Sequence, residues 1–148
     1  MAYDLEGKVG AARRASVEQP TAWDALGHFV RAAPTFGVSI APPQQGMPEL
    51  AAAIREDPQV RTARATLITL LESLVEAAQA EGMLRADVAT GDVVQLLALL
   101  KRRPVVPEEL AERVGARTRA LLLDALRADG RDALPGEPVR VEEFLDRT

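Results

Sequence analysis

His28 is the residue best suited to acid–base chemistry in this 148-residue chain, and it is the only histidine. Asp24 stands four residues earlier, so on a helix the two side chains would share one face, and His28 with Asp24 beside it could act as a general base. No nucleophile stands at a position that marks it as their partner. A partly buried histidine packed beside Trp23 and Phe29 is the simpler interpretation, so we expect no catalytic residue and no enzyme.

Metal and cofactor sites are not expected either. A chain with one histidine and no cysteine cannot supply a histidine-based zinc site or a thiolate site. Gly7 and Gly10 are isolated glycines, so the sequence contains no glycine-rich phosphate loop. We therefore expect neither a bound metal nor a cofactor.

The charge pattern bears on the partners of the chain. Its formal net charge is -4, which argues against a nucleic-acid-binding surface over the whole chain. The basic cluster Lys101–Arg103 ends an apolar segment, where cations complement a helix dipole, and it is too short for a DNA-binding patch. No apolar run is long enough to span a membrane, and the N-terminus does not resemble a signal peptide. Together with the absence of cysteine, these features fit a cytoplasmic protein.

A row of hydroxyl groups is the most distinctive polar pattern. Thr62, Thr66, Thr69 and Ser73 follow the spacing i, i+4, i+7 and i+11, in a segment whose neighbouring positions are mostly apolar. The row could line a polar or cavity-like space. The alternative, which we favour, is that these are boundary residues that donate to the carbonyl four residues earlier.

Helices are the elements that must position these side chains. No segment alternates apolar and polar residues for long, and aromatic residues make up only 3% of the chain. Thr21, Asp57–Pro58 and Thr90 are candidate helix starts, and Gly82 is a candidate helix end. The proline-rich stretch from Pro34 to Pro48 is predicted as a loop. The sequence predicts an all-α bundle of about six to seven helices, with expected helical ranges near 3–16, 21–33, 48–56, 58–81, 90–103 and 107–129 and a short turn after 140.

The stretch "DVVQLLALL", residues 92–100, has apolar side chains on every side of a helix. The expected helix from Pro107 also carries more apolar surface than one buried stripe. Two such helices indicate a homodimer in which both pack against their copies in an intermolecular four-helix bundle. The alternative is a monomer that buries both helices centrally. The predicted dimer-interface residues are Val93, Leu97, Leu100, Leu110, Val114, Leu121 and Ala125.

The segment "LLESLVEAAQAEGMLRADVATGDVVQLLALL" resembles the C-terminal regulatory domain of TetR-type transcriptional regulators. The resemblance rests on an alanine-rich "A-x-x-x-G" helix end, then "L-R-x-D-V", then "D-V-x-x-L-L". Upstream, "TAWDALGHFV" is similar to a "PWEALREWL"-like helix of the family. Downstream, "RALLLDALRADGRDALPGEPV" is similar to its "LLLDGLR"-like helix and "LPG" tail.

The resemblance implies an effector-sensing domain that dimerises through its last two long helices. Family members carry a helix-turn-helix head before this region, and residues 1–16 would be a remnant of the linking helix. We expect that head to be absent from this chain, so we expect no DNA binding from the chain alone. Residues 1–148 would form one ligand-binding and dimerisation domain, with a short helical tail at 139–148.

The resemblance also places a pocket for a small hydrophobic or aromatic effector among the helices that begin at Thr21, Pro48 and Pro58, closed on one side by the helix after Asp92. The expected ligand-binding residues are Trp23, His28, Phe29, Phe36, Met47, Leu50, Ile54, Thr66, Thr69, Leu70, Ser73 and Leu74. The alternative function is a stand-alone helical dimer that acts as a carrier of hydrophobic ligands or as an enzyme.

Overall fold

The computed structural model describes residues 2–35, 57–102, 104–130 and 132–145. Every regular element in these ranges is a helix, and Leu84 and Arg127 form an isolated antiparallel β-bridge. The all-α prediction is therefore confirmed. The helices are α1 (Ala2–Glu18), α2 (Ala22–Ala32), the 3₁₀ turn η1 (Ala33–Thr35), α4 (Pro58–Ala80), α5 (Thr90–Leu100), α6 (Glu108–Leu126) and α7 (Glu142–Leu145).

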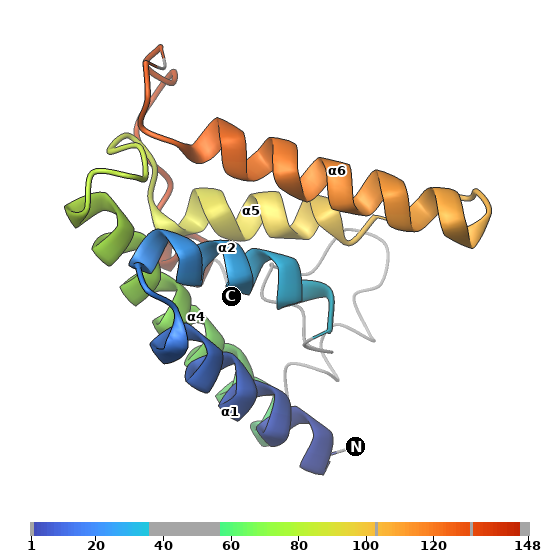
Figure 1. Ribbon diagram of the computed structural model, residues 1–148. Helices are drawn as coiled ribbons and strands as arrows, with labels where there is room; N and C mark the ends of the chain where they lie inside the picture. The colour runs from blue at the N-terminus through green and yellow to red at the C-terminus, as the bar shows by residue number, and fades with distance from the viewer. Residues whose placement is uncertain (1, 36–56, 103, 131, 146–148) are drawn as a thin grey trace.

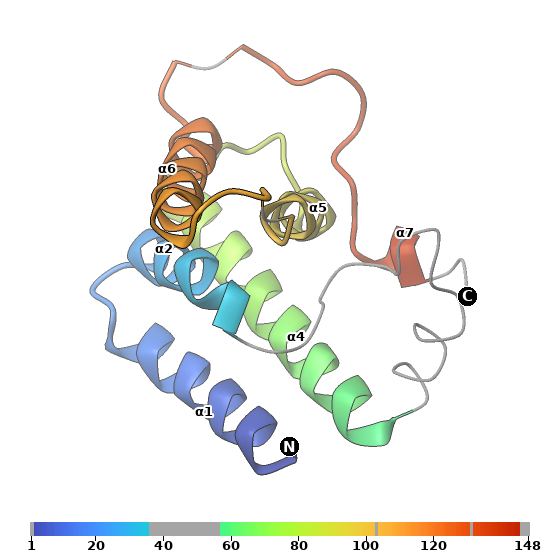
Figure 2. The same ribbon diagram turned by 90° about the vertical axis from the view of Figure 1, so that its right-hand side faces the viewer.

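The helices form two groups that meet at a shared core. The helices α1 and α4 lie beside each other and run in the same direction, with α2 packed across them (Figure 1). The helix α6 lies over α2, and α5 lies beside α6 and over α4 (Figure 2). The chain after α6 passes around α5 toward α7 (Figure 2), and its residues Val139 and Arg140 lie against the start of α5. No helix in the described ranges is both long and apolar enough to cross a membrane.

Local sequence signals explain the bounds of the long helix α4. Asp57 is its N-cap and accepts a hydrogen bond from the Gln59 amide at 2.9 Å, and Pro58 occupies the first turn. Proline is favoured there because its missing N–H would have no partner inside the helix. After the helix, Gly82 adopts a φ of 78°, a conformation that ends helices and that glycine adopts without strain. Both predicted ends of this helix are confirmed.

Two side chains cap the start of α2, and only one of them is local. Thr21 is the N-cap, as predicted, and its Oγ1 accepts a hydrogen bond from the Asp24 amide at 3.0 Å. The carboxylate of Glu81, at the end of α4, accepts hydrogen bonds from the amides of Ala22 at 2.8 Å and Trp23 at 3.1 Å. An anion at a helix N-terminus satisfies free amides and complements the helix dipole. Glu81 therefore fixes the end of α4 to the beginning of α2.

The start of α5 differs from the prediction. Ala89 is the N-cap residue, and Thr90, the expected cap, is the first residue of the helix and is buried. The capping acceptor is Asp92, whose Oδ2 accepts from the amides of Ala89 at 2.9 Å and Val139 at 3.1 Å. The prediction of Thr90 as the cap was wrong, because the helix already includes Thr90 and its start is capped by the Asp92 side chain, which bonds back to the Ala89 amide.

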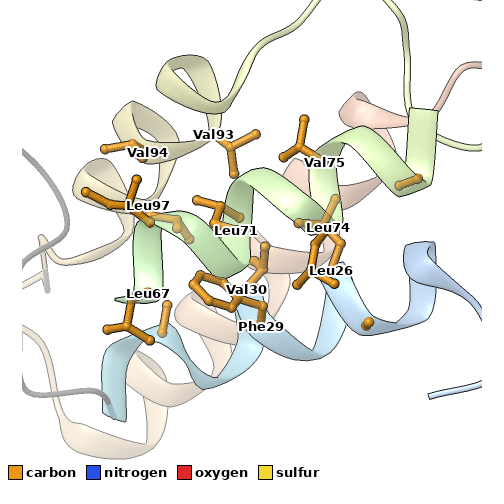
Figure 3. Packing of buried hydrophobic residues seen from close by; sticks show 14 of the residues in the cluster. Leu26, Phe29, Val30, Leu67, Leu71, Leu74, Val75, Val93, Val94 and Leu97 are labelled. Carbon is orange, nitrogen blue, oxygen red and sulfur yellow. The ribbon is translucent and has the colours of Figure 1, made fainter. Parts of the chain in front are cut away.

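The core lies between α2, α4 and α5. Figure 3 shows apolar side chains of α2 facing α4, while α5 packs on the other side of α4. Phe29 and Leu26 are almost completely buried, and Leu67 and Leu71 of α4 have no exposed surface. Burial of this apolar surface is the main term that stabilises such a bundle. The residues shown in contact are Leu26, Phe29, Val30, Leu67, Leu71, Leu74, Val75, Val93, Val94 and Leu97.

Candidate functional site

Two adjoining hollows follow the line along which α1 meets α4. Each has a volume of about 360 Å³, and they share Arg13 and Thr66. We call the two together the α1–α4 groove. The first hollow is lined by Glu6, Val9, Gly10, Arg13, Pro58, Gln59, Thr62, Ala63 and Thr66. The second is lined by Arg13, Ala65, Thr66, Thr69, Leu70 and Ser73.

The groove exists because α1 meets α4 through small side chains. Among the residues of α1 whose exposure is described, Ala12 is the only buried one, and Val9 is partly buried against the core. Gly10 lines the first hollow with no side chain of its own. Larger residues at these positions would fill the space between the helices. The absence of a side chain at Gly10 therefore leaves room beside α4.

The predicted hydroxyl row lines this groove and also bonds to its own helix. Thr62 donates to the carbonyl of Pro58 at 2.8 Å, and Thr66 donates to that of Thr62 at 3.0 Å. Ser73 donates to the carbonyl of Thr69 at 3.1 Å. The favoured interpretation, bonding to the carbonyl four residues earlier, is confirmed for these three hydroxyls. A hydroxyl that donates in this way keeps acceptor lone pairs, so each oxygen can still accept a hydrogen bond from a ligand.

Arg13 is the residue of the groove that the sequence reasoning missed. It is exposed on α1, lines both hollows, and forms no ion pair with any side chain that the structure describes. The acid Glu6 lies in the first hollow only. The part of the chain that the structure describes therefore gives the second hollow one cation and no carboxylate. The neighbouring Arg14 lines neither hollow, and nothing in "AARRAS" distinguishes the two arginines before the helices are packed.

The remaining predicted ligand-binding residues lie in different places. Phe29 and Leu74 are 1% and 8% exposed and belong to the closed core. His28 is partly buried on α2, and Trp23 lines a separate groove of about 320 Å³ between α2 and α6. In the described ranges, no three histidine, aspartate or glutamate side chains gather where they could hold a metal ion. Phe36, Met47, Leu50 and Ile54, and with them the helix expected from Pro48, lie outside the described residues.

The groove between α2 and α6 has a different chemical character. Arg31 and Arg127 line it together with Asp24 and Asp124, so the charges of these lining residues balance. Its apolar lining comes mainly from Trp23 and Leu123. A small ligand would meet mixed charges there, whereas the second hollow of the α1–α4 groove combines one cation with acceptor oxygens.

The predicted dimer-interface residues divide between core and surface. Val93 and Leu97 of α5 are 0% and 6% exposed, so they are buried inside the protomer, where they pack against α4 (Figure 3). Leu121 is 66% exposed, and Val114 and Ala125 are also exposed on α6. Leu100 and Leu110 are partly buried. Leu99, near the end of α5, was not among the predicted interface residues and is 51% exposed.

Comparison with known proteins identifies the family. The family described as "Transcriptional regulator SbtR-like, C-terminal domain" matches residues 21–128, which is most of the chain. The matched region begins with the N-cap of α2 and ends just after α6, so it includes α4 with its hydroxyl row and the pair α5 and α6. No curated protein matches the chain. The all-helical fold and this match establish that the chain belongs to the SbtR-like family of TetR-type regulator C-terminal domains.

Proposed function

We propose that this chain is the effector-sensing and homodimerisation domain of a TetR-type transcriptional regulator. The α1–α4 groove is the single observation that carries the sensing role. It combines a volume suited to a small molecule, apolar walls and a row of hydroxyl oxygens that sequence reasoning had already selected. The family match favours this role over the alternative of a carrier or an enzyme.

The apolar stripe on α6 supports dimerisation. Leu110, Val114, Leu121 and Ala125 stand at spacings of four, seven and four residues, which places them on one face of the helix. Ala111 and Leu126 are the buried residues of α6, and they lie on another face of the helix. Leu99 adds exposed apolar surface from α5. A second copy of the chain, packed through the same two helices, would bury this stripe in a four-helix bundle.

Sensing and dimerisation would be connected through α1. By the resemblance, α1 corresponds to the helix that links the domain to a DNA-binding head. Among the residues of α1 whose exposure is described, only Ala12 is buried, so residues 6–18 hold this helix on the bundle with little buried surface. A ligand in the α1–α4 groove would touch this helix directly. It changes the DNA-binding state only if it binds one position of α1 more tightly than another.

The experiment measures the melting temperature of the chain against a panel of small hydrophobic and aromatic compounds. The unaltered chain should be stabilised by at least one of them, since a ligand that binds only the folded state raises its stability. Ala65→Trp is the groove-filling variant, because Ala65 is exposed on α4 and lines the second hollow. Thr69→Val keeps the volume and removes one hydroxyl.

We expect Ala65→Trp to abolish the stabilisation by an active compound. Thr69→Val should leave the melting temperature of the free chain almost unchanged, because Thr69 is exposed, and should weaken ligand binding by about 1 kcal/mol. A stabilising compound whose effect survives Ala65→Trp would show that the effector binds elsewhere. A broad panel without any stabilising compound would contradict the sensing role.

A further inference from the structure

We infer that the α1–α4 groove selects an amphipathic anion, a ligand with one negative group and at least one hydrogen-bond donor on an apolar body. This inference rests on the proposed function and specifies the chemical class of its effector. It depends on three properties of the second hollow: the charge at its edge, the direction of its hydroxyl hydrogen bonds and its apolar wall.

Charge is the first property. Among the described residues that line the second hollow, Arg13 is the only charged one, and none is a carboxylate. A guanidinium presents several N–H donors in a planar arrangement and keeps its positive charge at every physiological pH. A carboxylate, sulfonate or phosphate group of a ligand can therefore be bound at this edge. The acid Glu6 in the first hollow would repel the same group, which orients the ligand with its anion toward Arg13 in the second hollow.

The hydroxyl geometry is the second property. The hydroxyl hydrogens of Thr66 and Ser73 already point to the carbonyls of Thr62 and Thr69. Their oxygens can therefore accept hydrogen bonds but do not donate them to a ligand without breaking these contacts. A carboxylate, which only accepts, gains nothing from them. A ligand hydroxyl or N–H group can donate to them, so the same ligand should carry a donor beside its anionic group.

The apolar wall is the third property. Leu70 is partly buried against the core and lines the second hollow together with Ala65. Beyond Arg13 and Thr66, which line both hollows, Val9 and Ala63 continue the apolar lining into the first hollow. The body of the ligand would bury apolar surface against these side chains, which supplies the non-directional part of the affinity. An anion without such a body, such as inorganic phosphate, would have only one exposed charge contact and should bind weakly.

The test uses two fluorescent probes that differ in charge. Anilinonaphthalene sulfonate has an anionic group, an N–H donor and an apolar body, and N-phenylnaphthylamine has the same body and donor without the sulfonate. Both are titrated into the unaltered chain, Arg13→Gln, Arg14→Gln and Ala65→Trp. The matched control is Arg14→Gln, since it removes the same charge from the next residue of α1, which lines neither hollow.

We expect Arg13→Gln to weaken binding of the sulfonate probe by roughly three- to tenfold, the range of an exposed charge-assisted hydrogen bond. Arg14→Gln should change it by less than about twofold, an effect of net charge alone. The uncharged probe should bind the unaltered chain, Arg13→Gln and Arg14→Gln with the same affinity. Added salt should weaken the sulfonate probe and not the uncharged one, because ions screen an exposed charge pair.

Two outcomes would overturn the inference and keep the proposed function. In the first, Arg13→Gln does not alter binding of the sulfonate probe. In the second, the uncharged probe binds the unaltered chain as tightly as the sulfonate probe does, and Ala65→Trp abolishes binding of both probes. If Ala65→Trp leaves both affinities unchanged, or neither probe binds the unaltered chain, the groove is not a ligand site, and the proposed function fails with the inference.

Discussion

Arg85 and Asp87 form a bidentate ion pair within the turn between α4 and α5. The distance from Nε to Oδ1 is 2.6 Å, and the distance from Nη2 to Oδ2 is 3.1 Å. The same guanidinium donates to the backbone carbonyls of Asp132 at 2.6 Å and Ala125 at 3.3 Å. Asp87 also accepts a hydrogen bond from the Leu134 amide at 2.9 Å. The pair therefore fastens this turn to the end of α6 and to the segment after it, and it explains what "L-R-x-D-V" does in the fold.

Asp87→Asn should lower the melting temperature in a pH-dependent way. The hydrogen bond from Arg85, followed by that from the Leu134 amide, holds the pKa of Asp87 below its ordinary value of 3.8. A carboxyl whose pKa is lower in the folded state stabilises the fold above its unfolded pKa. That contribution disappears as the pH falls through the folded pKa. Thermal unfolding at pH 7 and at steps toward pH 3 should show a gap between the two proteins that narrows in acid.

The control for Asp87→Asn is Asp129→Asn. Asp129 also follows an arginine by two residues, but its carboxylate is 80% exposed and lies 3.5 Å from the Nε of Arg127. An exposed pair of this kind contributes between zero and about 1 kcal/mol, so the control should unfold almost like the unaltered chain. A gap for Asp87→Asn that stays constant with pH, or that equals that of the control, would contradict this role for the pair.

Gly91→Ala should destabilise the chain because the segment after α6 passes directly over the start of α5. A β-carbon added at Gly91 would lie 2.5 Å from the carbonyl oxygen of Val139 and 2.8 Å from that of Arg140. Backbone must move to relieve such contacts, and overpacking of this kind costs about 1–3 kcal/mol. Chemical denaturation measures this loss in the free energy of unfolding.

Gly7→Ala is the opposite case and the control. Gly7 lies inside α1, and an added β-carbon would meet nothing within 4 Å. Alanine in a helix is favoured over glycine by about 0.5–1 kcal/mol, so this variant should be unchanged or slightly more stable. If both variants lose the same stability, the close approach at Gly91 is not the cause of its effect.

Local signals predicted the helices well, because a helix start depends on neighbours in sequence. Asp57–Pro58 and Thr21 show this, since each cap contacts amides within three residues. Thr90 is not the cap because α5 begins one residue earlier than expected, with Asp92 accepting from the Ala89 amide; the distant Val139 amide donates to the same oxygen. The sequence did not predict that Glu81 caps α2, because its partners at the start of α2 are almost sixty positions away in the sequence.

The candidate site was predictable on one helix and not on the other. The spacing of the hydroxyls shows that Thr66 and Ser73 share a face of α4, since helical periodicity alone determines this. The sequence does not show which helix lies beside that face. Arg13 enters the groove only through the packing of α1 on α4. The resemblance placed the pocket among these helices, and Phe29 and Leu74 were chosen there as large apolar side chains, a property that core residues share with pocket residues.

Leu121→Glu should dissociate the proposed dimer and leave the protomer folded. The side chain of Leu121 is 66% exposed in the single chain, so a charge there disturbs little within the protomer. In the dimer the same carboxylate would be buried against the partner without a counter-charge, which is costly. Sedimentation should show a dimer for the unaltered chain at micromolar concentration and a monomer for this variant, with helical circular dichroism retained in both.

Two further variants separate loss of assembly from loss of folding. Ala116→Glu places the same charge on an exposed position of α6 about 140° around the helix from Leu121, and it should stay dimeric. Leu97→Glu places it at a residue that is 6% exposed and packs against α4, so this variant should lose helical structure and not merely its partner. If Leu121→Glu and Ala116→Glu sediment alike, the stripe of Leu110, Val114, Leu121 and Ala125 is not the interface. An unaltered chain that is monomeric at micromolar concentration would rule out the dimer itself.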